Sequence, residues 1–249
     1  ATRCSDARRR VLNLEEAEAW LEGLINVERN PGHPYERLSL EPVSRLLGRL
    51  GHPERGLSVI HVAGSKGKGS TALFAESVLE AAGERVGTFT SPHLERWTER
   101  FRIGGREVPD ADLAAAVTTL RPVVEAQLRD ATAPDPSFFD VTTAAAFLLF
   151  REARVQRAIL EVGLGGRLDS TNVVDPAVSC ITTIELEHTD RLGATLAAIA
   201  GEKAGILKPG RPAVSGRLGP EAMSVVEARV AGRELGRFTV QPPQPHPVQ

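Results

Sequence analysis

VAGSKGKGST (Val62–Thr71) joins an apolar run at 57–63 to a helical pattern that continues to about residue 82. Glycines let the backbone N–H groups of such a loop turn toward an anion, and the helix start adds partial positive charge. The segment therefore predicts a strand, a phosphate-binding loop and a helix. Only two residues separate Gly64 from Gly67-Lys68, a shorter spacing than in the usual phosphate loop. A tight turn with a solvated lysine pair is the alternative interpretation.

Outward from this loop, apolar runs alternate with helical patterns. Further strands are expected at 85–90, 157–162, 177–184 and 212–215. Helices are expected at 13–29, after Ser39, and at 110–129, 140–153, 195–204 and 220–231. Asn13 and Glu16 have the spacing of a capping box, and Asp110 is expected to cap its own helix.

Strands that are apolar throughout and alternate with helices predict an α/β fold with a mostly parallel sheet and helices on both faces. The predicted organisation is an N-terminal helical segment at 1–56 packed on the core, an ATP-binding α/β domain at 57–236, and a Pro-rich tail or truncated linker at 237–249. Leu14, Ala17, Leu21, Leu24 and Ile25 are expected on the buried side of the first helix.

The overall charge excludes several classes of partner. Lys+Arg total 30 against Asp+Glu 32, a net charge of -2, which is no footprint for nucleic acid. No apolar run is long enough to span a bilayer, so no membrane partner is expected. Cys4 and Cys180 do not suggest a disulfide framework, and we expect a cytoplasmic protein.

Polar residues follow the predicted strands. Ser91 follows the strand at 85–90, Glu161 lies at the end of the strand at 157–162, and His188 follows the strand at 177–184. Because ligands of open α/β sheets bind beyond the carboxyl ends of the strands, these groups are expected to meet at one edge. Carboxylate and hydroxyl oxygens are suited to magnesium, with phosphate completing its shell. The run Gly163–Gly166 lacks the G-x-G-x-x-G spacing, which argues against a dinucleotide site.

Several long segments resemble one known family. HVAGSKGKGST resembles the HVAGTNGKGS segment of folylpolyglutamate synthases and dihydrofolate synthases, and the resemblance runs from about Leu14 to Leu235. Further matching segments are TSPHLERWTERFRIGG, FFDVTTAAAFLLF, LEVGLGGRLDSTNVV and ELEHTDRLGATLAAIAGEKAGILKPG. GLGGRLDSTN and HTDRLG…EKAGI separate this family from its relatives, the Mur ligases, whose central domain is a P-loop NTPase-like α/β fold.

The resemblance implies roles for individual residues. Lys68, Glu161, His188 and Lys203 would be catalytic, with Lys203 carrying a carbamate that helps to place a second metal ion. The segment Arg37–Glu41 would approach the pterin. The ATP phosphates would be bound by Gly64, Ser65, Lys66, Gly67, Lys68, Gly69, Ser70 and Thr71. Magnesium would be held by Ser70, Ser91, Glu161, His188 and Lys203. The pteroate site would be lined by Ser137, Phe139, Arg167, Leu168 and Asp169.

The resemblance also implies a reaction. An ATP-dependent ligase would add L-glutamate to dihydropteroate or a folate through an acyl phosphate, with ATP and Mg2+ required and a monomer expected. The alternative is a truncated paralogue that binds nucleotide or pterin without ligase activity, because relatives continue into a second, smaller domain. A different Mur-type ligase is disfavoured by the family-specific segments. Lys66 replaces the usual asparagine of the loop, and Glu187 replaces the usual aspartate before His188.

Overall fold

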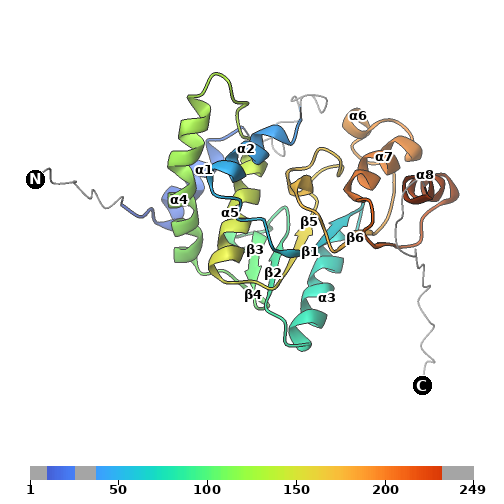
Figure 1. Cartoon of the computed structure of the whole chain (residues 1–249), viewed down its shortest axis with the longest axis horizontal. Coiled ribbons are helices and arrows are strands. Elements are labelled where there is room, and N and C mark those ends of the chain that lie inside the picture. Colours follow the sequence, from blue (N-terminus) through green and yellow to red (C-terminus); the bar gives the residue numbers. More distant parts are fainter. Residues whose placement is uncertain (1–9, 26–37, 232–249) are drawn as a thin grey trace, which may run out of the picture.

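The computed structural model describes residues 10–25 and 38–231, and within them seven strands form one sheet. The strand order is β4-β3-β2-β5-β1-β6-β7 (Figure 1). Neighbouring strands from β2 to β7 run parallel, whereas β3 and β4 are antiparallel to their neighbours. The predicted mostly parallel α/β fold is confirmed. The strands are β1 (Ser58–Ala63), β2 (Val86–Phe89), β3 (Phe101–Ile103), β4 (Arg106–Glu107), β5 (Arg157–Glu161), β6 (Val178–Ile181) and β7 (Ala213–Ser215).

Eight α-helices accompany these strands in the described part of the chain. In Figure 1, α1, α2, α4 and α5 gather to the left of the strands, α3 lies below them, and α6, α7 and α8 lie to the right. The helices are α1 (Leu14–Glu22), α2 (Glu41–Arg49), α3 (Lys68–Ala81), α4 (Asp110–Leu128), α5 (Phe138–Glu152), α6 (Thr189–Leu192), α7 (Leu196–Lys203) and α8 (Pro220–Ala231). Short 3-10 helices lie at Trp97–Arg100, Ser170–Val173 and Ala204–Ile206.

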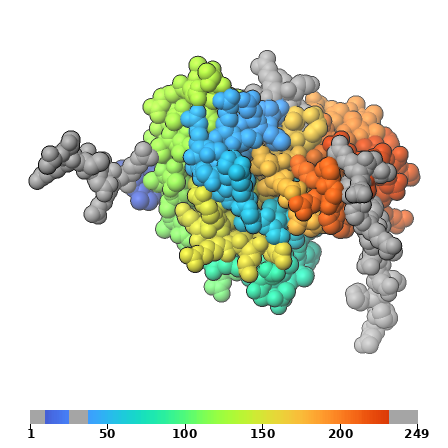
Figure 2. Space-filling model, in the orientation of Figure 1, coloured from blue at the N-terminus to red at the C-terminus, as the bar shows by residue number. Residues whose placement is uncertain are grey.

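The central strand β5 is buried on both of its faces. Ala158 and Leu160 belong to the apolar cluster that includes α5, whereas Ile159 packs in a separate cluster with Val62 and α3. Successive side chains of a strand point to opposite faces, so α5 and α3 cover opposite faces of the sheet. Figure 2 shows α2 and the loop after it, in blue, over the middle of the molecule between the green and the orange and red parts.

Some predicted helix boundaries differ from the structure. The capping box of Asn13 and Glu16 is present, but α1 ends at Glu22 and Ile25 is half exposed. The predicted extension over residues 26–29 lies outside the described residues. Asp110 does not cap α4: Pro109 occupies the cap position and Asp110 is the first helical residue. Helix α5 begins two residues early, because Ser137 and Asp140 form a capping box there.

The antiparallel strands β3 and β4 were not expected. They are short and carry charged side chains, and β3 pairs with β2 to close that edge of the parallel sheet. None of the helices in residues 10–25 and 38–231 combines the length and apolarity needed to cross a bilayer.

Candidate functional site

The glycine-rich loop is tied to the segment that follows β6. The Ser65 amide donates to the Thr183 carbonyl at 2.8 Å, and the Lys66 amide donates to Thr183 Oγ1 at 3.0 Å. Thr182 Oγ1 donates to the Lys66 carbonyl at 2.6 Å. The Ser65 hydroxyl accepts from the Glu185 amide at 2.9 Å, so this side chain anchors the loop. These contacts hold the loop between β1 and α3, with its amides at the start of a 14-residue helix.

Gly64 is required by the close approach of the Thr182 side chain. A Cβ atom at Gly64 would overlap the Thr182 hydroxyl oxygen. We expect Gly64→Ala to lower the free energy of unfolding by about 1–3 kcal/mol, the scale of an overpacked site. The matched control is Gly201→Ala in α7, where a Cβ atom meets nothing within 4 Å and a gain of up to ~1 kcal/mol is expected. Chemical denaturation measures both changes, and equal effects of the two substitutions would contradict the packing argument.

Lys66 and Lys68 have different surroundings. The Lys66 ammonium is exposed and forms an ion pair of 2.8 Å with Glu185 Oε2, a contact that raises the pKa of the lysine. Its charge is therefore shared with a carboxylate and is not held for phosphate alone. Lys68 begins α3 and lies close enough to Glu161 to stabilise the charged form of that carboxylate.

Glu161 lies where β5, the loop and the end of β2 meet. One oxygen, Oε2, accepts from the Ser91 amide at 3.1 Å, and the carboxylate also accepts from the Gly69 amide. Burial raises the pKa of Glu161, while these two amides and the Lys68 ammonium act in the opposite direction. The structure thus brings together three parts of the predicted site, and Ser91 contacts Glu161 through its main chain.

Lys203 is buried behind the loop. Its Nζ donates to the Gly64 carbonyl at 3.0 Å and forms an ion pair of 2.7 Å with Glu187 Oε1. Burial lowers the pKa of Lys203, and the Glu187 carboxylate opposes that shift. Lys203 therefore joins the loop to the segment that leads into His188.

A cavity of about 680 Å³ opens beside Ser91, whose amide donates to Glu161. Its wall includes Ser91, His188 and four of the five predicted pteroate residues, Ser137, Phe139, Leu168 and Asp169. Arg167 is not among the residues that line the cavity, and its guanidinium pairs with Glu202 at 2.9 Å. Of the segment Arg37–Glu41, Leu38 and Ser39 line the cavity, whereas Arg37 lies outside the described residues.

Aromatic rings and a cation form one side of this cavity. The Arg100 guanidinium lies 5.5 Å from the Trp97 ring centroid and 5.3 Å from that of Phe138. Arg100 Nε donates to His93 Nδ1 at 2.8 Å. This combination of flat rings and a guanidinium suits a planar aromatic ligand with an anionic end. The sequence alone did not single out Trp97 or Arg100, although an aromatic residue and an arginine follow the TSPH segment.

Asp140 lies in the cavity wall and stabilises the start of α5. Its Oδ1 accepts from the Ser170 hydroxyl at 2.6 Å, and its Oδ2 accepts from the Ser137 hydroxyl at 2.7 Å. Burial raises the pKa of Asp140, and these hydrogen bonds oppose the shift. Ser137 is thus the cap of α5 as well as a residue of the cavity wall.

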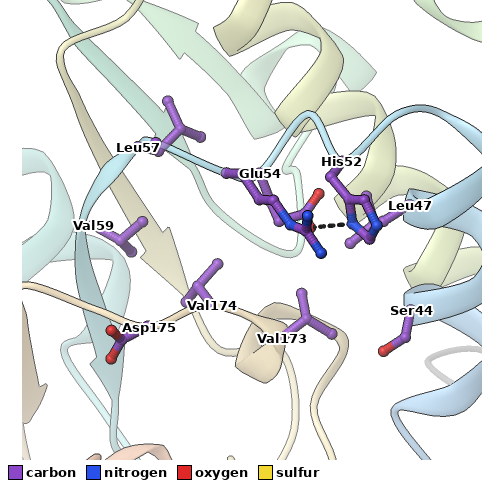
Figure 3. Close-up of a pocket in the computed structure, with 11 residues that line it drawn as sticks. Ser44, Leu47, His52, Glu54, Leu57, Val59, Val173, Val174 and Asp175 are labelled. Carbon is purple, nitrogen blue, oxygen red and sulfur yellow. Dashed lines mark hydrogen bonds and ion pairs between the residues drawn. The ribbon is translucent and has the colours of Figure 1, made fainter.

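A second cavity, of about 480 Å³, lies near the start of β1, at the end of this strand opposite to the glycine-rich loop. Figure 3 shows His52 and Glu54 facing each other on one wall, with Val173 and Val174 across from them. His52 Nδ1 and Glu54 Oε1 are 2.9 Å apart, so these polar groups pair with one another. The cavity is remote from the glycine-rich loop, and we assign it no role in the site.

Carboxylates and imidazoles do not form a ready-made metal cage in the described residues, where no group of three or more His, Cys, Asp or Glu side chains is placed to hold an ion. Ser91 and His188 line the same cavity, and the Ser91 amide donates to the Glu161 carboxylate. Such a set fits an ion that takes most of its ligands from phosphate and water, as magnesium commonly does.

Comparisons with known proteins find curated relatives and solved structures that resemble this chain. No protein-family model matches the chain. The chain is 43% identical over 213 residues to the dihydrofolate synthase/folylpolyglutamate synthase of Bacillus subtilis, covering 85% of this chain and 48% of that protein. A solved complex of a folylpolyglutamate synthase with AMPPCP and folate superposes with a TM-score of 0.83 at 38% identity, covering 92% of this chain and 54% of that one.

The folylpolyglutamate synthase of Mycobacterium tuberculosis, solved with ADP and AMPPCP, superposes with a TM-score of 0.80 at 37% identity. This match covers 91% of the present chain and 49% of the mycobacterial one. The chain thus spans about half the length of the proteins that it matches.

Proposed function

Because the chain belongs to the family of folylpolyglutamate synthases and dihydrofolate synthases, of which it spans about half the length, we propose that it serves the ATP-dependent addition of L-glutamate to dihydropteroate or a folate. In this proposal the loop Gly64–Thr71 binds the ATP phosphates, and the 680 Å³ cavity receives the pterin-containing acceptor. Glutamate and ATP are the other small-molecule partners.

One arrangement supports the proposal above all. The Glu161 carboxylate accepts from an amide of the loop, Gly69, and from the amide of Ser91, a residue that lines the 680 Å³ cavity. The γ-phosphate of a nucleotide on the loop would then lie next to a carboxylate group at the end of an acceptor in the cavity. Juxtaposition of these two reactants is what acyl-phosphate formation requires.

The chemistry explains the need for such a site. A free carboxylate is a poor acyl donor, so transfer of the γ-phosphoryl group gives an acyl phosphate with a good leaving group. The glutamate amine then forms the C–N bond, the C–O bond to phosphate breaks, and the amine loses a proton. Lys68 and the loop amides would neutralise charge on the phosphates, and the buried walls would exclude water that hydrolyses the acyl phosphate.

Magnesium fits the oxygen donors available here. Glu161 would be a direct ligand, with Ser70, Ser91 and His188 around it, and the ion would offset the charge of the phosphate oxygens. Burial raises the pKa of Glu161 because an unpaired carboxylate is poorly solvated there. A cation beside the carboxylate offsets this cost, and their attraction is stronger than it would be in water. Ser70 lies exposed in the first turn of α3, where a hydroxyl can face solvent-borne ligands.

Lys203 is proposed to carry a carbamate. Carbamylation joins a neutral amine to CO2 through a new N–C bond and releases one proton, and the lowered pKa of Lys203 increases the neutral fraction. The ion pair with Glu187 opposes the reaction, because the product is an anion that faces a carboxylate. Formation should therefore increase as pH rises through the pKa of the lysine.

We expect a carbamate carbon resonance when the protein is placed in 13C-bicarbonate at about pH 8, with a weaker signal at about pH 6, since only the unprotonated amine reacts. Lys203→Arg removes the reactive amine and should abolish this resonance. Lys208→Arg, which changes another partly buried lysine with a lowered pKa, is the matched control. A signal that persists in Lys203→Arg, or is absent from the unchanged protein, would contradict the assignment.

ADP release tests the proposed reaction. The purified chain is incubated with MgATP and either dihydropteroate or tetrahydrofolate, with and without L-glutamate. Release of ADP that depends on both the acceptor and glutamate is the expected result. Binding of MgATP without glutamate-dependent release would overturn the ligase proposal and support nucleotide or pterin binding without ligation.

A further inference from the structure

Three buried polar side chains link β1, the strand that precedes the glycine-rich loop, to the wall of the 680 Å³ cavity. His61 lies on β1, three residues before Gly64, and its Nε2 is 2.8 Å from Thr171 Oγ1. Thr171 Oγ1 is in turn 2.5 Å from Asp169 Oδ1. His61 and Thr171 are completely buried and Asp169 is 5% exposed, so solvent does not compete for these hydrogen bonds.

The direction of each hydrogen bond follows from the number of protons available. The Thr171 hydroxyl has one hydrogen and donates it to the Asp169 carboxylate. The same oxygen must then accept from His61 Nε2, which therefore carries the proton. Burial lowers the pKa of His61 to about 3, so the ring is neutral and its Nδ1 bears no hydrogen. Nδ1 has no hydrogen-bond partner within the described residues, so no acceptor there calls for a proton on this nitrogen.

The Asp169 carboxylate also accepts hydrogen bonds from main-chain amides of the loop after β5. Its Oδ2 accepts from the amides of Gly163 at 2.9 Å and Leu164 at 3.0 Å. Its Oδ1 also accepts from the Thr171 amide at 3.0 Å. The carboxylate thereby closes the loop 163–169 on itself. Gly163, Leu164, Leu168 and Asp169 all line the cavity, so the shape of this loop is the shape of one cavity wall.

We propose that His61 and Thr171 are positioning residues for the acceptor substrate, forming with Asp169 a directed hydrogen-bond chain that holds the loop 163–169 in its binding shape. The occupant named here, a pterin-containing acceptor, rests on the proposed function. Because β1 leads directly into the glycine-rich loop, the same chain joins the acceptor wall to the strand that presents the nucleotide site. Neither His61 nor Thr171 was singled out from the sequence, although a histidine within the apolar run VIHVA is a visible signal.

The charged groups that face His61 and Asp169 are compatible with a neutral His61 ring and an ionised Asp169. Lys208 is the cation that faces His61, and its charge disfavours a second proton on the ring. Asp169 is faced by the Glu161 carboxylate and by the Lys203 ammonium. Burial raises the pKa of Asp169 to about 6, so at neutral pH the group is the carboxylate that accepts these hydrogen bonds.

A matched pair of substitutions at Thr171 tests the hydrogen-bond chain. Thr171→Val removes the hydroxyl while keeping the shape, and Thr171→Ser keeps the hydroxyl. Thr171→Val is expected to weaken dihydropteroate binding roughly tenfold, the scale of one buried hydrogen bond, whereas Thr171→Ser stays within about threefold of the unchanged protein. MgAMPPCP binding, measured by the same titration calorimetry, should change by less than about twofold in both variants. Undiminished dihydropteroate binding by Thr171→Val, or a parallel loss of MgAMPPCP binding, would overturn the positioning role.

Nuclear magnetic resonance separates this idea from the proposed function. In 15N-labelled protein, the His61 ring should show the Nε2–H tautomer unchanged between about pH 5 and 8. Amide exchange at Gly163 and Leu164 should accelerate in Thr171→Val and not in Thr171→Ser. An Nδ1–H tautomer of His61, or amide exchange that is unaltered in Thr171→Val, would show that the hydrogen-bond chain does not exist as described. Failure of the unchanged protein to bind dihydropteroate would instead contradict the proposed function, and with it the substrate named here.

Discussion

Binding of MgATP to Lys68→Ala is expected to be about 10- to 100-fold weaker than to the unchanged protein, because a hydrogen bond to a charged group contributes about 1.5–3 kcal/mol. Lys68 starts α3 beside the buried Glu161 carboxylate, where the loop amides and the helix start also face an anion. If the chain turns over ATP, kcat should fall by roughly a hundredfold or more, since transition-state charge on the phosphoryl group loses a fixed counter-charge. Titration calorimetry and ADP release measure the two effects.

Lys66→Ala is the matched control for this substitution. Lys66 lies two positions earlier in the same loop, but its side chain is 76% exposed and is paired with Glu185. Exposed pairs contribute little, so the loss of nucleotide affinity should stay within about fivefold. A larger loss of affinity in Lys66→Ala than in Lys68→Ala would show that Lys66, and not Lys68, makes the phosphate contact.

Glu161→Gln is expected to remove most of the magnesium dependence of nucleotide binding. The unchanged protein should bind AMPPCP more tightly with Mg2+ than without it, and the variant should bind both forms with similar affinity. Turnover, where present, should fall by about 10²- to 10³-fold, the effect of losing one preorganised electrostatic group. The fold should survive, because replacing a buried carboxylate whose pKa is raised by burial removes a desolvation cost.

Glu185→Gln supplies the comparison for Glu161→Gln. Glu185 also borders the glycine-rich loop, but it is about half exposed and pairs with Lys66, whereas the Ser91 amide donates to Glu161. Its neutralisation should leave the difference between magnesium-bound and magnesium-free affinity intact. If both substitutions abolish that difference, a general loss of negative charge near the loop explains the result, and Glu161 is not the specific ligand.

The parallel sheet was predictable because its strands are short apolar runs separated by helical patterns, which is a local signal. β1 and its glycine-rich loop illustrate this, since sequence alone placed both within one or two residues. β3 and β4 escaped prediction because they are very short and charged, and only pairing with β2 makes them strands. The start of α5 was missed although Ser137-x-x-Asp140 is a capping-box pattern.

Long-range contacts explain what the sequence left open in the candidate site. The resemblance implied that Lys66 binds phosphate, and the sequence did not reveal that its ion-pair partner Glu185 would come from the segment after β6. His61 and Thr171 are 110 residues apart in sequence, so their contact exists only once β1 and the 3-10 helix are folded together. Arg167 matched a family segment, yet its pairing with Glu202 directs it to a different neighbour.

The most direct test is a paramagnetic one, in which Mn2+ replaces Mg2+ with AMPPCP and the amide resonances of the 15N-labelled chain are monitored. Convergence of Lys68, Ser91, Glu161 and His188 on one metal–triphosphate site predicts selective broadening of their signals and of those of the glycine-rich loop. Residues of the remote cavity, such as His52 and Val173, should keep their line widths. Broadening that spares Glu161 and His188, or that centres on His52 and Val173, would contradict the proposed site.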